Sequence, residues 1–267
     1  MIRMVLNNYS DYSFVLVKPD AMRNEKILDN LYQLIKSNKL EVVEELPVRL
    51  SEDQINGLWP MYKSCQLTRV FIKKYLSDEL CKVIVLHGTE ALDKTCNIKK
   101  EIRSRFGQGF FSNCIHAPRT ADENENDICL LTGEEIYKVK TSEYMEGLWG
   151  KAAELDITEL EKTVDIIWER KEQYGWEAVY EMQLKDHLKS GVDLKVYDDT
   201  DHSMDYIIST LYEFLGKHIS FTDIVIGVLD ISRRGETTIR IANDIKETEL
   251  EEKIKMMLGK GLKSERI

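Results

Sequence analysis

The chain has 267 residues, of which 43% are hydrophobic and 31% charged, with a formal net charge of −10. This length suits one large domain or two ordinary ones, and the apolar content suffices for a substantial core. An acidic chain is a poor general nucleic-acid binder, because affinity for a phosphate backbone comes mainly from lysine and arginine. A local basic pocket for a small phosphate ligand is still compatible with this charge.

The start of the chain, Met1 to Ser10, has neither the apolar segment nor the small-residue cleavage site of a signal peptide. No window approaches the roughly twenty apolar residues of a membrane span. None of the cysteines sits in a Cys-x-x-Cys pair, which argues against a structural zinc site. We therefore expect a cytoplasmic protein with reduced thiols that binds neither nucleic acid nor a membrane.

The first half of the chain predicts alternating strands and helices around one sheet. Ser13–Lys18 is a β-branched and aromatic run that stops at Pro19, which is typical of a buried strand. Apolar residues in 24–37 recur at helical spacing, and the capping-box pair Ser51 and Gln54 opens a second helix. Further strands are expected at Leu40–Leu50 and Cys81–Leu86, a further helix at Thr68–Leu76, a short helical turn at Thr89–Thr95, and a glycine- and aromatic-rich segment at Phe106–Ile115.

A domain boundary is expected within 133–142, which gives domains 1–135 and 136–267. Beyond it, 143–190 predicts two helical segments separated by Gly175. The remainder predicts a small α+β module in which Arg233 and Arg234 lie at a hairpin tip in solvent. Its expected elements are a strand at Leu194–Asp198, a helix at Ser203–Leu215, strands at Phe221–Ile231 and Glu236–Ala242, and a helix at Thr248–Leu258.

The first candidate for chemistry is Lys18, in the sequence Val17-Lys18-Pro19-Asp20 at the end of the first strand. The following proline keeps the lysine backbone extended, so the ammonium leaves the strand end in a fixed direction. Such a group suits a phosphate or a hydroxyl. The alternative is an ordinary strand-to-turn transition, because Pro-Asp is a common turn pair.

The second candidate is His116, which follows Asn113 by three residues and has Arg103 and Arg105 upstream. A nucleophilic imidazole needs one ring nitrogen free and the other held by an acceptor. It also needs cations near the incoming phosphoryl group, which the arginines would supply. The acidic residues downstream either hold the imidazole or form a solvated helix N-terminus; they are Asp122, Glu123, Glu125 and Asp127.

This combination resembles the nucleoside diphosphate kinase family over about Tyr12 to Gly133, roughly half of the chain. The resemblance rests on four short motifs in the family's order and near its spacing. A strand ending in Lys-Pro-Asp opens the region, and Ile102-Arg103, Phe106-Gly107 and Asn113-x-x-His116 close it. Lys74–Leu76 and Val83–Gly88 also look like the family's helix end and the strand that follows it.

The resemblance implies an α+β fold of the ferredoxin-like type and transfer of the terminal phosphate of a nucleoside triphosphate to a diphosphate. The implied route is a phosphohistidine at His116, with ATP or another triphosphate as donor and Mg²⁺ bound through the nucleotide phosphates. Lys18 would touch the sugar hydroxyl and the phosphate, Arg103 would hold the transferring phosphate, and Asn113 would bind the sugar. The family's assembly implies a homo-oligomer, a dimer or higher.

Three further positions follow from the same resemblance. Asp127 falls where the family has a glutamate that orients the histidine, and its side chain is shorter. Phe71 and Tyr62 are the candidates for the aromatic clamp on the base. Arg119 follows Ala117-Pro118, where the family usually has Gly-Ser-Asp, so a hydroxyl near the histidine is lost and a cation gained.

The segment between Gly88 and Arg103 is shorter than in the family and lacks an arginine and a threonine that bind phosphates. Thr95, Lys99 and Lys100 are the possible replacements. The loss implies either an altered acceptor or weak activity. The rival function is therefore a catalytically degenerate module that binds nucleotides and serves regulation or partner binding, and a third is transfer from His116 to a residue of a partner protein.

The second half carries no family signature. Its polar residues Lys185, His187 and 198–202 suggest either a metal site or, more simply, a polar turn before a helix with Asp201 or Ser203 as N-cap. Trp149, Trp168 and Trp176 are expected in a core or an interface.

Overall fold

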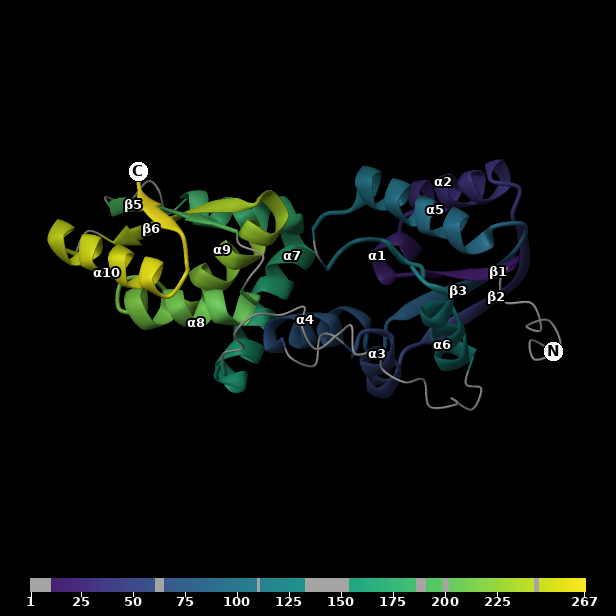
Figure 1. Cartoon of the computed structure of the whole chain (residues 1–267), viewed down its shortest axis with the longest axis horizontal. Coiled ribbons are helices and arrows are strands. Elements are labelled where there is room, and N and C mark those ends of the chain that lie inside the picture. Colours follow the sequence, from purple (N-terminus) through teal and green to yellow (C-terminus); the bar gives the residue numbers. More distant parts are fainter. Residues whose placement is uncertain are drawn as a thin grey trace. The chain divides into compact units, whose positions relative to one another are not determined.

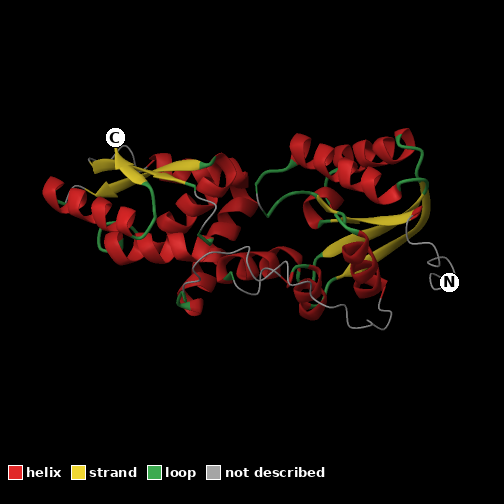
Figure 2. Ribbon diagram, in the orientation of Figure 1, coloured by secondary structure: helices red, strands yellow, loops and turns green. Residues whose placement is uncertain are grey.

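A computed structural model describes residues 11–60, 65–109, 111–132, 154–185, 191–198, 202–242 and 245–267. The chain forms two compact units (Figures 1 and 2). Unit 1 comprises Met1–Pro60 and Phe71–Ser142, and unit 2 comprises Met61–Val70 and Glu143–Ile267. The predicted boundary within 133–142 lies outside the described residues, and the sequence did not predict that Met61–Val70 belongs with unit 2.

Unit 1 is built on a four-stranded antiparallel sheet with the strand order β2-β3-β1-β4. Its strands are β1 (Tyr12–Val17), β2 (Glu41–Arg49), β3 (Leu80–His87) and β4 (Ile115–His116). Its helices are α1 (Pro19–Met22), α2 (Glu25–Ser37), α3 (Glu52–Leu58), α5 (Ala91–Phe106) and α6 (Ala121–Thr132), and α4 (Gln66–Leu76) ends in it. This order, with α2 and α5 on one face, is the ferredoxin-like arrangement that the family resemblance implies.

The two faces of this sheet have different roles. Helices α2 and α5 cover one face, and α6 lies on the other (Figure 1). Because successive strand residues point to opposite faces, Val15 and Val17 join the core under α2 and α5. Leu16 and its register partner His116 therefore point to the α6 face.

Capping explains where two of these helices begin. Asn24 caps α2, since its side chain accepts a hydrogen bond from the backbone N–H of Lys26. Ser51 and Gln54 form the predicted capping box of α3, each side chain bonding the other residue's backbone N–H. These helix starts confirm the sequence prediction.

Helix α5 is much longer than the short turn predicted at Thr89–Thr95. It runs to Phe106, because Ala91, Ile98 and Ile102 form a continuous apolar stripe against the sheet. Most of the shortened segment is therefore one continuous helix, which begins four residues after the end of β3 and contains Arg103.

Unit 2 combines a three-stranded antiparallel sheet, with the order β6-β5-β7, and packed helices. Gly175 interrupts α7 with a φ of 79°, at the position where two helical segments were predicted to separate. Its described elements are α7 (Ile157–Lys185), β5 (Gly191–Tyr197), α8 (Met204–Leu215), α9 (Phe221–Arg234), β6 (Glu236–Ala242), α10 (Glu247–Gly259) and β7 (Ser264–Arg266).

The predicted strand at Phe221–Ile231 was wrong, because this segment is helix α9. Its β-branched residues suit a strand, but the helix is buried on nearly all sides, so tertiary packing outweighs local propensity. Ser220 caps its start and Gly235 ends it in the left-handed conformation. Arg233 and Arg234 accordingly lie in the last turn of a helix and bind Asp230, instead of lying at a hairpin tip.

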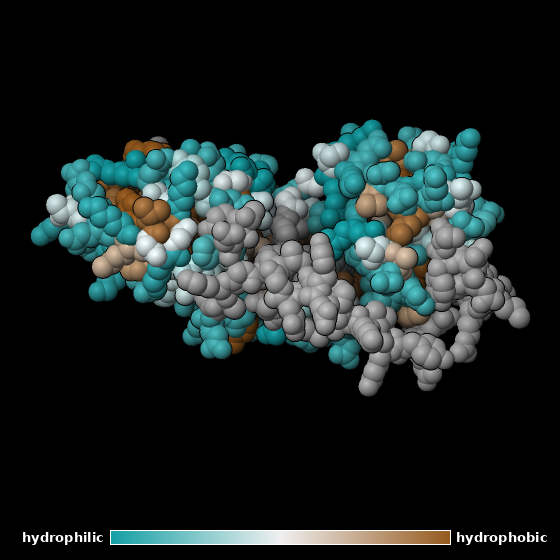
Figure 3. Space-filling model, in the orientation of Figure 1, coloured by the Kyte–Doolittle hydropathy of each residue, from teal (hydrophilic) through white to brown (hydrophobic). Residues whose placement is uncertain are grey.

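Most of the described surface on the face drawn in Figure 3 is hydrophilic, with smaller apolar patches on each unit. Within the described residues, no helix combines the length and the hydrophobicity needed to cross a bilayer.

Candidate active site

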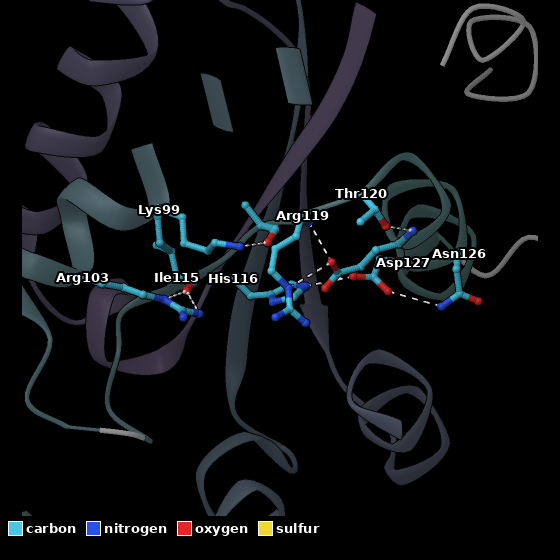
Figure 4. Close-up of polar contacts among 10 residues, drawn as sticks. Lys99, Arg103, Ile115, His116, Arg119, Thr120, Asn126 and Asp127 are labelled. Atoms are coloured by element: carbon cyan, nitrogen blue, oxygen red, sulfur yellow. Dashed lines mark hydrogen bonds and ion pairs between the residues drawn. The ribbon is translucent and has the colours of Figure 1, made fainter. Parts of the chain in front are cut away.

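The sheet of unit 1 brings the predicted histidine and lysine close together. Strand β4 pairs with the end of β1, with Leu16 opposite His116 and Val17 opposite Ile115. Lys18 follows β1 directly and forms the N-cap of α1. Helix α6 packs on the same face as His116 and contributes Asp127 (Figure 4).

His116 and Asp127 form a buried hydrogen-bonded pair. Nε2 of His116 lies 2.9 Å from Oδ2 of Asp127, and the two residues are 4% and 1% exposed. Oδ1 of Asp127 accepts from the Asn126 side chain at 3.3 Å. No described residue hydrogen-bonds Nδ1 of His116. The shorter aspartate therefore reaches the imidazole and leaves Nδ1 available for chemistry.

Burial and local charge shift both members of this pair toward neutral forms. Burial, followed by the positive charges of Lys18, Lys99, Arg103 and Arg119, holds the pKa of His116 well below its usual value of 6.5. Burial, followed by the charge of Glu123, raises the pKa of Asp127 to about 8. The imidazole is thus neutral at neutral pH, and Nδ1 has a free lone pair once Asp127 has lost its proton and the ring proton lies on Nε2.

Lys18 is the second buried group of the site. Its ammonium donates to Oδ1 of Asn113 at 2.6 Å and lies over the rings of Trp59 and Tyr75, 5.3 and 5.7 Å from their centroids. Burial first, and then the charge of Arg103, lower the pKa of Lys18 to about 7. The structure thus brings together the lysine and the asparagine that the sequence singled out.

Asp20 fixes the turn that leads to the histidine, and sequence reasoning had assigned it no role beyond a turn. Its carboxylate accepts from the backbone N–H of Cys114 at 2.9 Å and from the Tyr75 hydroxyl. Cys114 has a φ of 66°, a left-handed conformation that non-glycine residues adopt only when their surroundings impose it. The Pro-Asp pair after β1 thus supports the site as well as forming a turn.

Arg103 and Lys99 extend from the same face of α5 toward β4 (Figure 4). Nε and Nη2 of Arg103 donate to the carbonyl of Ile115 at 3.0 and 2.8 Å. Nζ of Lys99 donates to the carbonyl of Ala117 at 2.5 Å. The two cations thus hold the backbone on either side of His116.

The other two candidates for the missing phosphate ligands do not reach this site. Thr95 is buried against the sheet, where its hydroxyl bonds Ser13 at 2.7 Å. Lys100 is exposed to solvent. Of the three residues considered from sequence, only Lys99 is directed toward His116.

Arg119 is the most exposed of the cations around the histidine. Its backbone N–H donates to Oε2 of Glu123 at 2.7 Å, and its Nε lies 3.4 Å from the same oxygen. His116, Glu123 and Asp127 each offer one ligand atom, all within 4.8 Å of one another. These atoms are already engaged with one another or with Arg119, and four cations surround them, so the cluster is poorly suited to a metal cation.

The predicted aromatic clamp is not formed by Phe71. Its ring is fully buried and stacks on Phe111 at 4.6 Å, so it packs in the interior instead of offering a face to a base. Tyr62 lies outside the described residues. Trp59, which the sequence analysis had not identified, lies edge-on to His116 with 5.2 Å between ring centroids. No sequence motif marked this tryptophan.

The polar residues singled out in the second half do not form a comparable site among the described residues. Ser203 caps α8 by accepting from the N–H of Tyr206, as predicted for a polar turn. Trp168 and Trp176 pack edge to face, consistent with a core role. His187, Asp199, Asp201 and Trp149, and the side chain of Lys185, lie outside the described residues.

Proteins similar to this chain include nucleoside diphosphate kinases, while no family model matches the chain. A nucleoside diphosphate kinase of Nitrosospira multiformis is 27% identical over 119 residues, which covers 40% of this chain and 83% of that protein. The solved nucleoside diphosphate kinase of Aquifex aeolicus is 21% identical, covering 45% of this chain and 93% of its own, with a TM-score of 0.38. That of Encephalitozoon cuniculi is 16% identical, covering 50% and 97%, with a TM-score of 0.41.

The residues that carried the resemblance in sequence lie together in the structure. Lys18, Arg103, Asn113 and His116, which carried the resemblance in sequence, converge in space around one buried imidazole. A region that makes up 40% of this chain is therefore similar to a nucleoside diphosphate kinase.

Proposed function

We propose that this protein transfers the terminal phosphoryl group of a nucleoside triphosphate, through a phosphohistidine on Nδ1 of His116, to a nucleoside diphosphate. The observation that carries the proposal is the buried pair of His116 and Asp127, which engages Nε2 and leaves Nδ1 unbonded by any described residue. The similarity to nucleoside diphosphate kinases supports the substrate class.

The proposed step is a substitution at phosphorus. The Nδ1 lone pair forms the N–P bond, and the bond between the γ-phosphorus and the bridging oxygen breaks, releasing a nucleoside diphosphate. Asp127 in its ionised form keeps the proton on Nε2 and stabilises the charge that develops on the ring. In the second half-reaction, a terminal oxygen of the acceptor diphosphate takes the phosphoryl group and regenerates the imidazole.

Cations around His116 would stabilise the charge on the transferring group. Lys18, Lys99, Arg103 and Arg119 all lie near enough to lower the pKa of the imidazole. Their positions are fixed before substrate binds, because most of them are held by backbone or amide acceptors. Such an arrangement favours an anion with several negative charges, such as a nucleotide polyphosphate.

Mg²⁺ fits this site as a companion of the nucleotide. It prefers oxygen ligands and commonly binds through substrate phosphates. The nearest protein donor set, His116, Glu123 and Asp127, includes a nitrogen and is engaged in internal hydrogen bonds. We expect no all-protein magnesium cage here, and the ion would neutralise phosphate charge when bound with the triphosphate.

The test is incubation with γ-labelled ATP and Mg²⁺, comparing wild type with His116→Ala. We expect an acid-labile, alkali-stable label in the wild type that is absent from the variant, and transfer of that label to added nucleoside diphosphates. Candidate protein partners are added in a parallel reaction, because label passing to them alone would replace the nucleotide acceptor. An unlabelled wild type would contradict phosphotransfer.

One observation favours a second candidate, a nucleotide-binding module without phosphotransfer. His116 is only 4% exposed, and Trp59 lies against its ring, so a phosphate must displace part of this packing to reach Nδ1. Calorimetry with a non-hydrolysable triphosphate separates the two: binding without any label would support the module. The expected homo-oligomer stays a prediction.

A further inference from the structure

Strand β4 exposes two backbone carbonyls at the edge of the sheet. The register pairs His116 with Leu16, and the backbone N–H of Lys18 donates to the carbonyl of Cys114 at 2.9 Å. In an antiparallel pair, alternate residues direct their hydrogen-bonding groups toward the partner strand. The carbonyls of Ile115 and Ala117 therefore point away from β1, and the side chains of α5 reach them there.

Lys99 and Arg103 meet these two carbonyls as a pair. They lie four residues apart on α5, so they project from one face of the helix. Lys99 binds the carbonyl that follows His116, and Arg103 binds the carbonyl that precedes it. Any anion that reaches the histidine thus lies close to the Lys99 ammonium as well as to Arg103.

The Lys99 ammonium is buried and forms no ion pair with a described residue, although Glu123 lies near enough to raise its pKa. The residue is 7% exposed, and its one hydrogen-bond partner among the described residues is the neutral Ala117 carbonyl. An ammonium has three N–H donors, so two remain uncommitted. Lys82, by contrast, forms an ion pair with Glu45 at 2.9 Å. A buried ammonium that bonds no anion directly is costly for the fold, which indicates that it has an anionic ligand.

We propose that Lys99 is a phosphate-binding residue, whose uncommitted N–H groups contact oxygens of the phosphoryl group as it approaches Nδ1 of His116. The assignment rests on the proposed function for the identity of the anion, a nucleotide polyphosphate. Lys99, which lies on the continuous helix α5, would take the place of the phosphate-binding residues that the shortened segment lacks. Lys99 keeps its bond to Ala117 while doing so, so phosphate binding and the position of the β4 backbone are linked through one side chain.

The electrostatics agree with this geometry. Burial lowers the pKa of Lys99 from its ordinary value, and the neighbouring cations Arg103 and Arg119 lower it further. A bound polyphosphate reverses the sign of the local potential and favours the charged ammonium. Thr95 and Lys100 have neither the burial among cations nor the direction toward His116 that this role requires.

The experiment uses inorganic pyrophosphate as the probe, because its binding needs neither a nucleoside nor phosphorylation of His116. Calorimetry at one fixed salt concentration compares wild type with Lys99→Gln, which keeps an N–H donor but loses the charge, and with Lys99→Arg, which keeps both. Lys100→Gln, the adjacent exposed lysine, is the matched control. We expect the dissociation constant of pyrophosphate to be about ten- to hundredfold larger for Lys99→Gln than for wild type, the range for loss of a charged hydrogen bond. Lys99→Arg and Lys100→Gln should stay within about threefold of wild type.

Equal affinities in Lys99→Gln and Lys100→Gln would overturn the assignment. Nuclear magnetic resonance of the ε-position of Lys99 in the wild type gives an answer that does not depend on how Lys99→Gln folds. We expect this signal to move on titration with pyrophosphate and to saturate with the calorimetric constant, while that of Lys100 stays in place. An unmoved Lys99 signal at saturation would also overturn it.

Labelling of His116 is measured separately, so the two proposals fail separately. If the wild type binds pyrophosphate through Lys99 but takes no label from ATP, the phosphate site is supported and the phosphotransfer function is contradicted. If the wild type is labelled but Lys99→Gln binds pyrophosphate as the wild type does, the phosphotransfer function is supported and the role of Lys99 is contradicted.

Discussion

Both units bury charged side chains, but they satisfy them in opposite ways. In unit 1, buried Lys18 and Lys99 bind only neutral acceptors, an amide and a backbone carbonyl, among the described residues. In unit 2, the buried carboxylate of Asp230 accepts from Arg233, Arg234 and Thr237. The two buried lysines of unit 1 thus form no ion pair with a described residue, while Asp230 of unit 2 pairs with two arginines.

The difference separates a site from a structural network. An uncompensated buried charge lowers the stability of the folded state, so it is retained where a ligand uses it. A carboxylate paired on all sides contributes to the fold and has little capacity left for a ligand. The cluster around His116 is therefore the functional one, and each prediction below tests that assignment.

The largest effect is expected from Asp127→Asn. Oδ1 of Asp127 already accepts from Asn126, so the substituted amide would present its N–H to Nε2 of His116. The imidazole would then carry its proton on Nδ1, the nitrogen that must attack. A histidine held in the wrong tautomer loses on the order of 10⁴ in rate, and we expect a loss of about 10²–10⁴ in single-turnover labelling.

The control for Asp127→Asn is its thermal stability, which should fall less than that of wild type as the pH rises, although labelling is lost. Burial raises the pKa of Asp127 to about 8 in the folded state, from a usual value of 3.8. A raised carboxyl pKa contributes stability that is complete below the unfolded value and is lost as pH rises through the folded value. Wild type should therefore lose melting temperature toward about pH 8, and Asp127→Asn should lose less. A variant that is both unstable and inactive would assign Asp127 a structural role.

The pH dependence of labelling gives the next largest effect. While the pair of His116 and Asp127 holds two protons, one lies between Nε2 and Oδ2 and the other blocks Nδ1. One proton must leave, so labelling should fall about tenfold per pH unit below the apparent pKa of about 8, as for any essential base. The groups facing the pair are Lys18, Lys99, Arg103, Arg119 and Glu123.

Saturating nucleotide separates this proton from that of Lys18, whose pKa is lowered to about 7. Loss of the Lys18 charge should raise KM, whereas loss of the pair's proton should raise kcat. A kcat that does not change with pH between about 6 and 8 would contradict the proton assignment.

Much of the fold and of the candidate site of unit 1 could be predicted from the sequence, because the signals there are local. The strand before Lys18, the capping box at Ser51 and the short motif ending at His116 each depend on neighbouring residues. What it missed depends on contacts between distant segments. Trp59 reaches the imidazole from another element, and Lys99 was one of three candidates until the helix placed it opposite Ala117.

The errors in unit 2 have the same physical origin. Helix α9 is rich in β-branched residues because it is buried on nearly all sides, and such a run does not distinguish a helix from a strand. The pair Ser220 and Asp223 marked a helix start, since the Ser220 hydroxyl accepts from the Asp223 N–H at 3.1 Å. Phe71 looked like a binding residue because nothing in the sequence reveals that Phe111 covers it.

In unit 2, Asp230→Asn should lower the free energy of unfolding by about 2 kcal/mol, the range for hydrogen bonds to a charged group. It removes the charge that organises Arg233, Arg234 and Thr237. Urea unfolding gives the size of the effect, and hydrogen exchange locates it in α9 and β6. Glu161→Gln, on the exposed face of α7, is the matched control and should leave stability unchanged. If folded Asp230→Asn lost the labelling of His116, the Asp230 network would not be purely structural, which would contradict the distinction drawn between the two units.

The smallest effect is expected from Asp205→Ala. Asp205, in α8, accepts from the backbone N–H groups of Gln66 and Leu67 at 2.5 and 3.0 Å, so it caps the start of α4. Loss of such a cap costs about 1 kcal/mol, and hydrogen exchange at these two amides should rise before that elsewhere in unit 2. Labelling of His116 should stay at the wild-type rate, because this carboxylate is committed to backbone donors. If Asp205→Ala altered the labelling of His116, Asp205 would act on the site. The hydrogen bonds that a buried charge makes within the protein would then not tell a structural charge from a functional one.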